Sequence, residues 1–128
     1  MLYLNYQGRR WAVYFDLSSI PAGATVTAAT LRYRVYNGAA LNAPVGAYRL
    51  RTDWLTGAAW QTPGGDWADR DGLPQGTAPY TSTLVNADWT WGAWDLTDLV
   101  QEWIAGQSPN YGVFLKVDTV TSAYGQAF

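Results

Sequence analysis

Large apolar side chains recur at every second position in several stretches of the chain, a pattern typical of strands that bury one face of a sheet. Between residues 11 and 17, this pattern places four apolar side chains on one face: Trp11, Val13, Phe15 and Leu17. The alternation returns between residues 28 and 36, where Leu31, Tyr33 and Val35 share one face and Arg32, Arg34 and Tyr36 share the other. We predict two half-buried strands, separated by a turn at residues 21–23.

A third strand is predicted from about Val45 to Thr52, where Tyr48 and Leu50 alternate with Arg49 and Arg51. We expect the tyrosine and the leucine to face the core. The arginines of this strand and of the preceding one then predict a solvated sheet face.

The periodicity fails between residues 57 and 88, where Gly, Pro, Asp, Thr and Ala dominate and Trp60, Trp67 and Tyr80 are interspersed. A loop of about thirty residues is long for a compact domain, and such loops are usually functional or contain short strands. Regular structure is expected to resume near Trp89, with a strand that runs to Leu96.

One short helix is predicted at about residues 97–105. Asp98 and Gln101 have the spacing of a capping box, with Thr97 as a competing N-cap, and Gly106 stands where a helix commonly stops. One apolar stripe follows the helical period: Leu99, Val100, Trp103 and Ile104.

A last strand is expected near residues 113–117, with Val113, Leu115 and Val117 facing inward. Short alternating strands, frequent turn residues and a single helix predict an all-β fold. The specific prediction is a jelly-roll-like antiparallel β-sandwich that forms one domain over residues 1–128.

The amino-acid composition argues against several classes of function. The chain has 128 residues, 48% hydrophobic and 14% charged, with a net charge of −2. Lys116 is the only lysine, which argues against the basic surface that nucleic-acid binding requires. Cys and His are both absent, which excludes thiol catalysis and removes the commonest general base. The sequence has neither an apolar run of membrane-spanning length nor an opening signal peptide, so any export signal is expected outside it.

Two further stretches are motif-like: residues 10–26 (RWAVYFDLSSIPAGATV) with Ala29-Thr30-Leu31, and residues 94–103 (WDLTDLVQEW) with Gly106 and residues 110–112. They resemble the two signatures of the DNRLRE domain family, and Trp54 and Trp60 occupy the stretch where that family tends to have two tryptophans. The resemblance spans about residues 9–117.

The resemblance implies a jelly-roll-like sandwich from secreted or cell-surface prokaryotic proteins. Members are often repeated or attached to carbohydrate-active enzymes, some are carbohydrate-binding modules, and they are not enzymes themselves. Asp16, Asp95 and Thr97 match motif positions, and we interpret them as fold determinants. Members usually carry further strands at both ends. This chain is therefore expected either to be a fragment or to have its open edges completed by neighbouring subunits.

Catalysis and metal binding receive less support from the residues. Glu102 and Asp95 lie on or beside the predicted helix, a poor frame for paired carboxylates across a sugar, so we expect no enzymatic activity. A calcium site is one interpretation of Asp66, Asp69 and Asp71, which share a Gly-rich loop. A solvated acidic loop, or pairing with a neighbouring arginine, is the alternative.

Four aromatic residues in or beside the irregular region are the candidates for stacking on sugar rings: Trp60, Trp67, Tyr80 and Trp89. Periodicity assigns Trp11, Trp94 and Trp103 to the core. It does not decide whether Trp54 and Trp91 lie in the core or on the surface.

Two functions from different classes remain. The first is a non-catalytic extracellular module that binds a polysaccharide or cell-surface glycan. The second is a structural subunit of an extracellular fibre or surface assembly, in which further copies of the chain complete its sheet edges.

Overall fold

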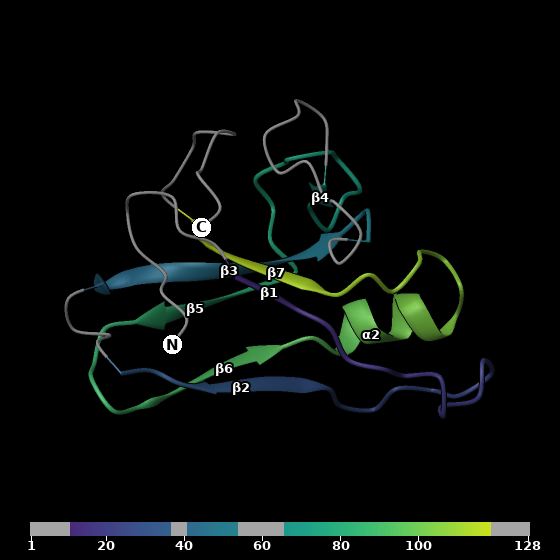
Figure 1. The fold of residues 1–128 in the computed structure, drawn as a ribbon, viewed down its shortest axis with the longest axis horizontal. Helices are drawn as coiled ribbons and strands as arrows, with labels where there is room; N and C mark the ends of the chain where they lie inside the picture. The colour runs from purple at the N-terminus through teal and green to yellow at the C-terminus, as the bar shows by residue number, and fades with distance from the viewer. Residues whose placement is uncertain (1–10, 37–40, 54–65, 119–128) are drawn as a thin grey trace.

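The computed structural model describes residues 11–36, 41–53 and 66–118, which form two antiparallel sheets and one helix (Figure 1). In chain order the elements are β1 (Trp11–Val13), β2 (Thr30–Arg34), β3 (Ala43–Leu50), β4 (Trp67–Ala68), β5 (Thr81–Val85), β6 (Trp91–Asp95), α2 (Thr97–Ile104) and β7 (Val113–Val117). The predicted all-β, sandwich-like fold with one short helix is confirmed.

Strand β3 is the centre of the larger, five-stranded sheet. One of its edges pairs with β7, which in turn pairs with β1. Its other edge pairs first with β5, over residues 43–47, and then with β4, at residues 49–50. The predicted last strand is confirmed as β7.

Strands β2 and β6 form the smaller sheet, which lies below the larger one in Figure 1. In this pair Leu31 lies opposite Trp94, and both side chains are buried against the larger sheet. The Trp94 indole Nε1 donates a hydrogen bond to the carbonyl oxygen of Val45 at 2.8 Å. Trp94 therefore joins the two layers by a hydrogen bond as well as by packing.

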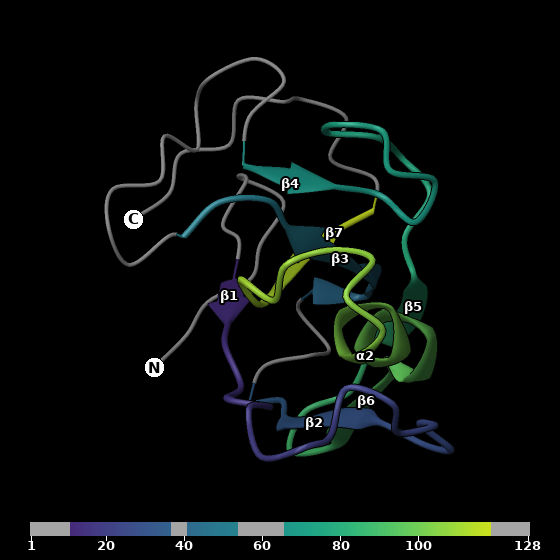
Figure 2. The ribbon, with the colours of Figure 1, turned by 90° about the vertical axis from the view of Figure 1, so that its right-hand side faces the viewer.

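Helix α2 closes one end of the sandwich, between the two sheets (Figure 2). Leu99, Trp103 and Ile104 are buried, as the helical stripe predicted, and Gly106 ends the helix with a φ of +72°. The expected side-chain caps are wrong, because the N-cap is Leu96, which makes no side-chain cap bond. Gln101 instead accepts the Val26 N–H at 2.7 Å, which holds the segment before β2 against the helix.

Strand β3 is buried on both faces, and this corrects the predicted direction of its side chains. Val45 faces the main core between the sheets, whereas Tyr48 packs in a second cluster on the opposite face of the larger sheet. Arg49 shares the face of Val45, where its Nε lies 3.5 Å from Glu102 Oε1. The prediction that Arg49 lies on a solvated face is therefore wrong, while Arg51 is exposed.

The first strand is shorter than predicted. Val13 pairs with Val113, the first residue of β7, so the ladder has no further partner residue beyond this point. Phe15, expected inside, is consequently 43% exposed.

The long irregular segment contains two strands, β4 and β5, as one of its two interpretations anticipated. The predictions for Trp54, Trp60 and both chain ends lie outside the described residues.

Candidate functional site

The outward face of the smaller sheet carries a group of exposed aromatic and cationic side chains. Alternation turns Leu31 and Tyr33 of β2 toward the core and leaves Arg32 and Arg34 exposed. In the β2–β6 register, Arg34 lies opposite Trp91. We call this surface the arginine–tryptophan face; its residues are Arg32, Arg34, Tyr36, Trp89 and Trp91.

The three aromatic side chains of this face are mostly open to solvent: Trp89 is 60% exposed, Trp91 56% and Tyr36 53%. They also contact their neighbours. The Arg32 guanidinium lies 5.1 Å from the centre of the Trp91 ring, and that of Arg34 lies 6.0 Å from the Trp89 ring. Cation–π contacts of this kind orient both partners without covering the whole ring.

The turn between β5 and β6 places Trp89 at one end of this face. Trp89 has a φ of +57°, a left-handed conformation that is unfavourable for a bulky residue. The following residue fixes the turn: Thr90 donates its hydroxyl to the Ala87 carbonyl oxygen, and its own carbonyl accepts the Val35 N–H. The Trp89 ring then packs edge-on against Tyr36, with ring centres 4.4 Å apart.

This arrangement suits binding of an extended molecule that has both apolar and oxygen-rich surfaces. Flat indole faces cover apolar patches of a ligand, and guanidinium groups donate hydrogen bonds to oxygen atoms.

Asp95, at the other end of β6, accepts hydrogen bonds from the backbone N–H and the hydroxyl of Thr97 through Oδ1. These bonds lower the pKa of Asp95 below its usual value and favour its ionised form.

The structure separates the four aromatic residues predicted to bind sugar. Trp89 lies on the arginine–tryptophan face, whereas Trp67 is 3% exposed and stacks against Phe114 in the second cluster, with no open ring face. Tyr80 is half-buried and donates its hydroxyl to Glu102 at 2.6 Å; burial and this bond raise its pKa. Trp60 lies outside the described residues.

Two of the three predicted calcium ligands, Asp66 and Asp69, have separate structural roles, and Asp71 is exposed. Asp69 is buried and accepts backbone N–H groups from Asp71, Leu73 and Ala78, so its carboxylate organises the turn that follows β4. Asp66, also buried, accepts the Thr52 hydroxyl at 3.1 Å. Within the described ranges, no three acidic side chains are grouped so that they could hold a metal ion.

Four residues of the arginine–tryptophan face were not predicted from the sequence to bind a ligand: Arg32, Arg34, Tyr36 and Trp91. Arg32 and Arg34 had been interpreted only as part of a solvated face, and Trp91 was left open. Alternation along β2 already placed both arginines outward. What the sequence lacked was the register of β2 against β6, which sets the arginines beside Trp91.

The fold and this face define an all-β, sandwich-like module with an exposed aromatic surface. The disaggregatase related repeat domain family matches residues 5–128, and the chain belongs to this family. The chain is therefore a repeat domain, and its interpretation as a DNRLRE domain is wrong. The comparison of its ends with DNRLRE members accordingly no longer applies.

No curated protein matches the chain. In the part of the chain that the structure describes, no helix is long and apolar enough to cross a membrane.

Proposed function

We propose that this repeat domain is a non-catalytic, extracellular module that binds polysaccharide or cell-surface glycan through the arginine–tryptophan face. The observation that carries the proposal is the pair of exposed indoles, Trp89 and Trp91, each with an arginine guanidinium above its ring. Large exposed apolar groups are unusual on a monomer surface when they cluster, and such clusters commonly mark binding sites.

The chemistry of the face matches a sugar chain. Pyranose rings present C–H groups that pack on flat aromatic faces, while their hydroxyl oxygens accept hydrogen bonds from guanidinium groups. The face lies along a β-sheet and is built from two neighbouring strands, so it suits successive sugar residues of a chain. It requires no metal or cofactor.

The first prediction concerns Trp91→Ala. We expect this substitution to weaken binding to immobilised polysaccharides by about tenfold or more, because tryptophans at the centre of a binding surface contribute most of the affinity. The measurement is affinity electrophoresis against a panel of neutral and anionic polysaccharides, followed by calorimetry on those that retard the wild type.

Leu73→Ala is the control, because Leu73 is 60% exposed and lies in the turn that follows β4, outside the arginine–tryptophan face. Its affinity is expected to equal that of the wild type. Unchanged retardation of Trp91→Ala by every polysaccharide that binds the wild type would refute this site, and failure of the wild type to bind any of them would refute the function.

A structural subunit of an extracellular fibre or surface assembly is the second candidate. Its support is the repeat character of the family and the exposure of Leu73 and Leu84, at 60% and 58%, in addition to the exposed tryptophans. In that case contacts between copies would cover these side chains.

A further inference from the structure

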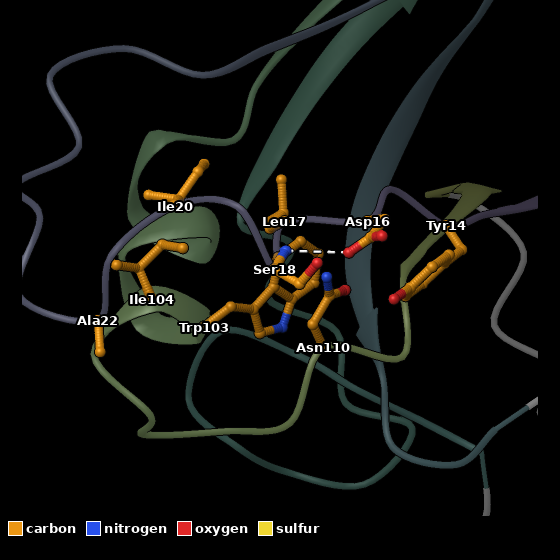
Figure 3. Close-up of a pocket in the computed structure, with 9 residues that line it drawn as sticks. All are labelled: Tyr14, Asp16, Leu17, Ser18, Ile20, Ala22, Trp103, Ile104 and Asn110. Carbon is orange, nitrogen blue, oxygen red and sulfur yellow. Dashed lines mark hydrogen bonds between the residues drawn. The ribbon is translucent and has the colours of Figure 1, made fainter.

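A pocket of about 300 Å³ lies beside the C-terminal end of α2, apart from the arginine–tryptophan face (Figure 3). Three segments that are distant in the sequence form it: residues 14–22 after β1, the end of α2, and the loop that precedes β7. Its side chains divide into two groups in Figure 3, with Tyr14, Asp16 and Asn110 on one side and Ile20, Ala22 and Ile104 on the other.

The apolar side of the pocket rests on the core. Trp103 and Ile104 are each 8% exposed, so they form a floor that the sandwich holds in place. Ile20 is 37% exposed and forms an apolar rim. A ligand with a C–H face can therefore cover apolar surface here that is otherwise in contact with water.

The polar side is held in position by hydrogen bonds within the protein. Asp16 Oδ1 accepts the Ser18 backbone N–H at 2.9 Å. The Asn110 side chain donates to the Phe15 carbonyl oxygen at 2.9 Å and accepts the Gly112 N–H at 3.1 Å, which ties the two walls together. A pocket whose walls are fixed in this way loses little conformational entropy when a ligand binds.

Asp16 provides acceptors that its own turn does not use up. A carboxylate has about four lone-pair sites, and the Ser18 backbone N–H takes one of them. Hydrogen bonding to Ser18 lowers the pKa of Asp16, so the group is an ionised acceptor at neutral pH. The remaining sites suit a pair of neighbouring hydroxyl donors.

Charge limits the class of ligand. Asp16 is the only charged residue among the nine that line the pocket in the described part of the chain. An anionic ligand would meet a carboxylate without a compensating cation, and a single carboxylate is too few ligands for a metal ion. The lining therefore disfavours an anionic molecule and suits a neutral one that has hydroxyl donors and one apolar face.

We propose that this pocket is a second binding site, which takes one neutral pyranose residue at the end of a glycan chain. Its volume suits a single ring, in contrast to the open arginine–tryptophan face. Hydroxyl groups of the sugar donate to Asp16, and its C–H face packs on Ile20 and on the floor formed by Trp103. The inference extends the proposed glycan-binding function, but it uses different residues.

Titration of the ¹⁵N-labelled chain, followed by NMR, tests this site. The probes are methyl glycosides of glucose, galactose, mannose, N-acetylglucosamine and N-acetylgalactosamine. With at least one of them we expect saturable shifts of the Ser18, Ala22 and Asn110 backbone amides and of the Trp103 indole N–H. Asp16→Asn is expected to weaken this binding by about tenfold, since it removes a charged acceptor.

Ala22→Trp is a second variant, which blocks the pocket from an exposed rim position without removing a hydrogen bond. We expect it to abolish the shifts. Asp98→Asn, which removes the same charge from an exposed position on α2, is the matched control and should leave them unchanged.

These experiments can refute the proposed pocket and the proposed arginine–tryptophan site separately. Loss of the shifts in Ala22→Trp and their persistence in Trp91→Ala would support the pocket, whatever the fate of the arginine–tryptophan face. Absence of pocket shifts with every glycoside at 100 mM, about the upper limit for weak specific binding, would overturn the pocket. So would shifts that survive both pocket variants. Polysaccharide binding that depends on Trp91 would stand in either case.

Discussion

Gly106 and Gly112 both adopt left-handed backbone conformations, with φ values of +72° and +108°, but their surroundings differ. A Cβ atom added to Gly106 meets no atom within 4 Å, whereas one added to Gly112 lies 2.5 Å from the Val13 carbonyl oxygen. The absence of a Cβ atom at Gly112 therefore allows the end of β1 to approach the start of β7, in addition to allowing the turn itself.

Substitution of these two glycines should separate the cost of conformation from the cost of contact. We expect Gly106→Ala to lower the free energy of unfolding by about 1 kcal/mol, the usual cost of the left-handed conformation. Gly112→Ala should lower it by about 3 kcal/mol, because the backbone of Val13 must also move. Urea denaturation followed by tryptophan fluorescence measures both. Equal losses would show that the close approach carries no cost.

The local structure around each residue also explains why the aromatic residues predicted to bind sugar lie in different parts of the fold. Sequence alone placed Trp67 in a Gly-rich loop, where an exposed ring is common. Its burial follows from a two-residue strand, β4, which is too short to show periodicity and which sets the ring against Phe114. Trp89, in a similar irregular context, is exposed because the turn holds it beyond the sheet.

At the scale of elements, the alternation of β2 predicted its buried and exposed faces, because one side of that strand is solvated. The prediction of a solvated face on β3 was wrong for the opposite reason. Both faces of this strand are covered, so its alternation does not distinguish a buried face from a solvated one. The stripe of α2 was predictable from its period, but the partner of Gln101 was not, since Val26 is 75 residues away.

The start of α2 gives a prediction for pH dependence. Asp95 bonds to the N–H and hydroxyl of Thr97, and these bonds lower its pKa from the ordinary value of 3.8. A carboxyl group whose pKa is lower in the folded state stabilises the fold above its unfolded pKa, and this contribution is lost as pH falls through the folded pKa. We therefore expect Asp95→Asn to be less stable than the wild type at pH 6, and the difference to shrink below about pH 4.

Urea denaturation of both proteins between pH 2.5 and pH 7 measures this difference. Asp98→Asn is the control, because it removes the same charge from an exposed position in the first turn of α2. A difference for Asp95→Asn that stayed constant down to pH 2.5 would mean that the ionised carboxylate is not the stabilising form.

At the scale of the whole molecule, the two candidate functions require different states of the isolated chain. Contact between two arginine–tryptophan faces through a twofold axis would bring Arg32 and Arg34 of one copy against those of another. Like charges brought together at an interface are unfavourable by several kcal/mol. The cations on this face therefore oppose self-association through it, whereas they are compatible with sugar oxygens.

We accordingly expect a monodisperse monomer of 14.1 kDa over a wide range of protein concentration. Light scattering after size-exclusion chromatography measures the mass, and negative-stain electron microscopy shows any ordered assembly. Fibres, or a mass that rises with concentration, would favour the structural subunit. Trp89→Ala then locates the contact, because a fibre that depends on this ring would use the arginine–tryptophan face for neighbouring copies. A fibre that persists in Trp89→Ala would direct attention to the exposed leucines, Leu73 and Leu84, and would leave that face free for glycan.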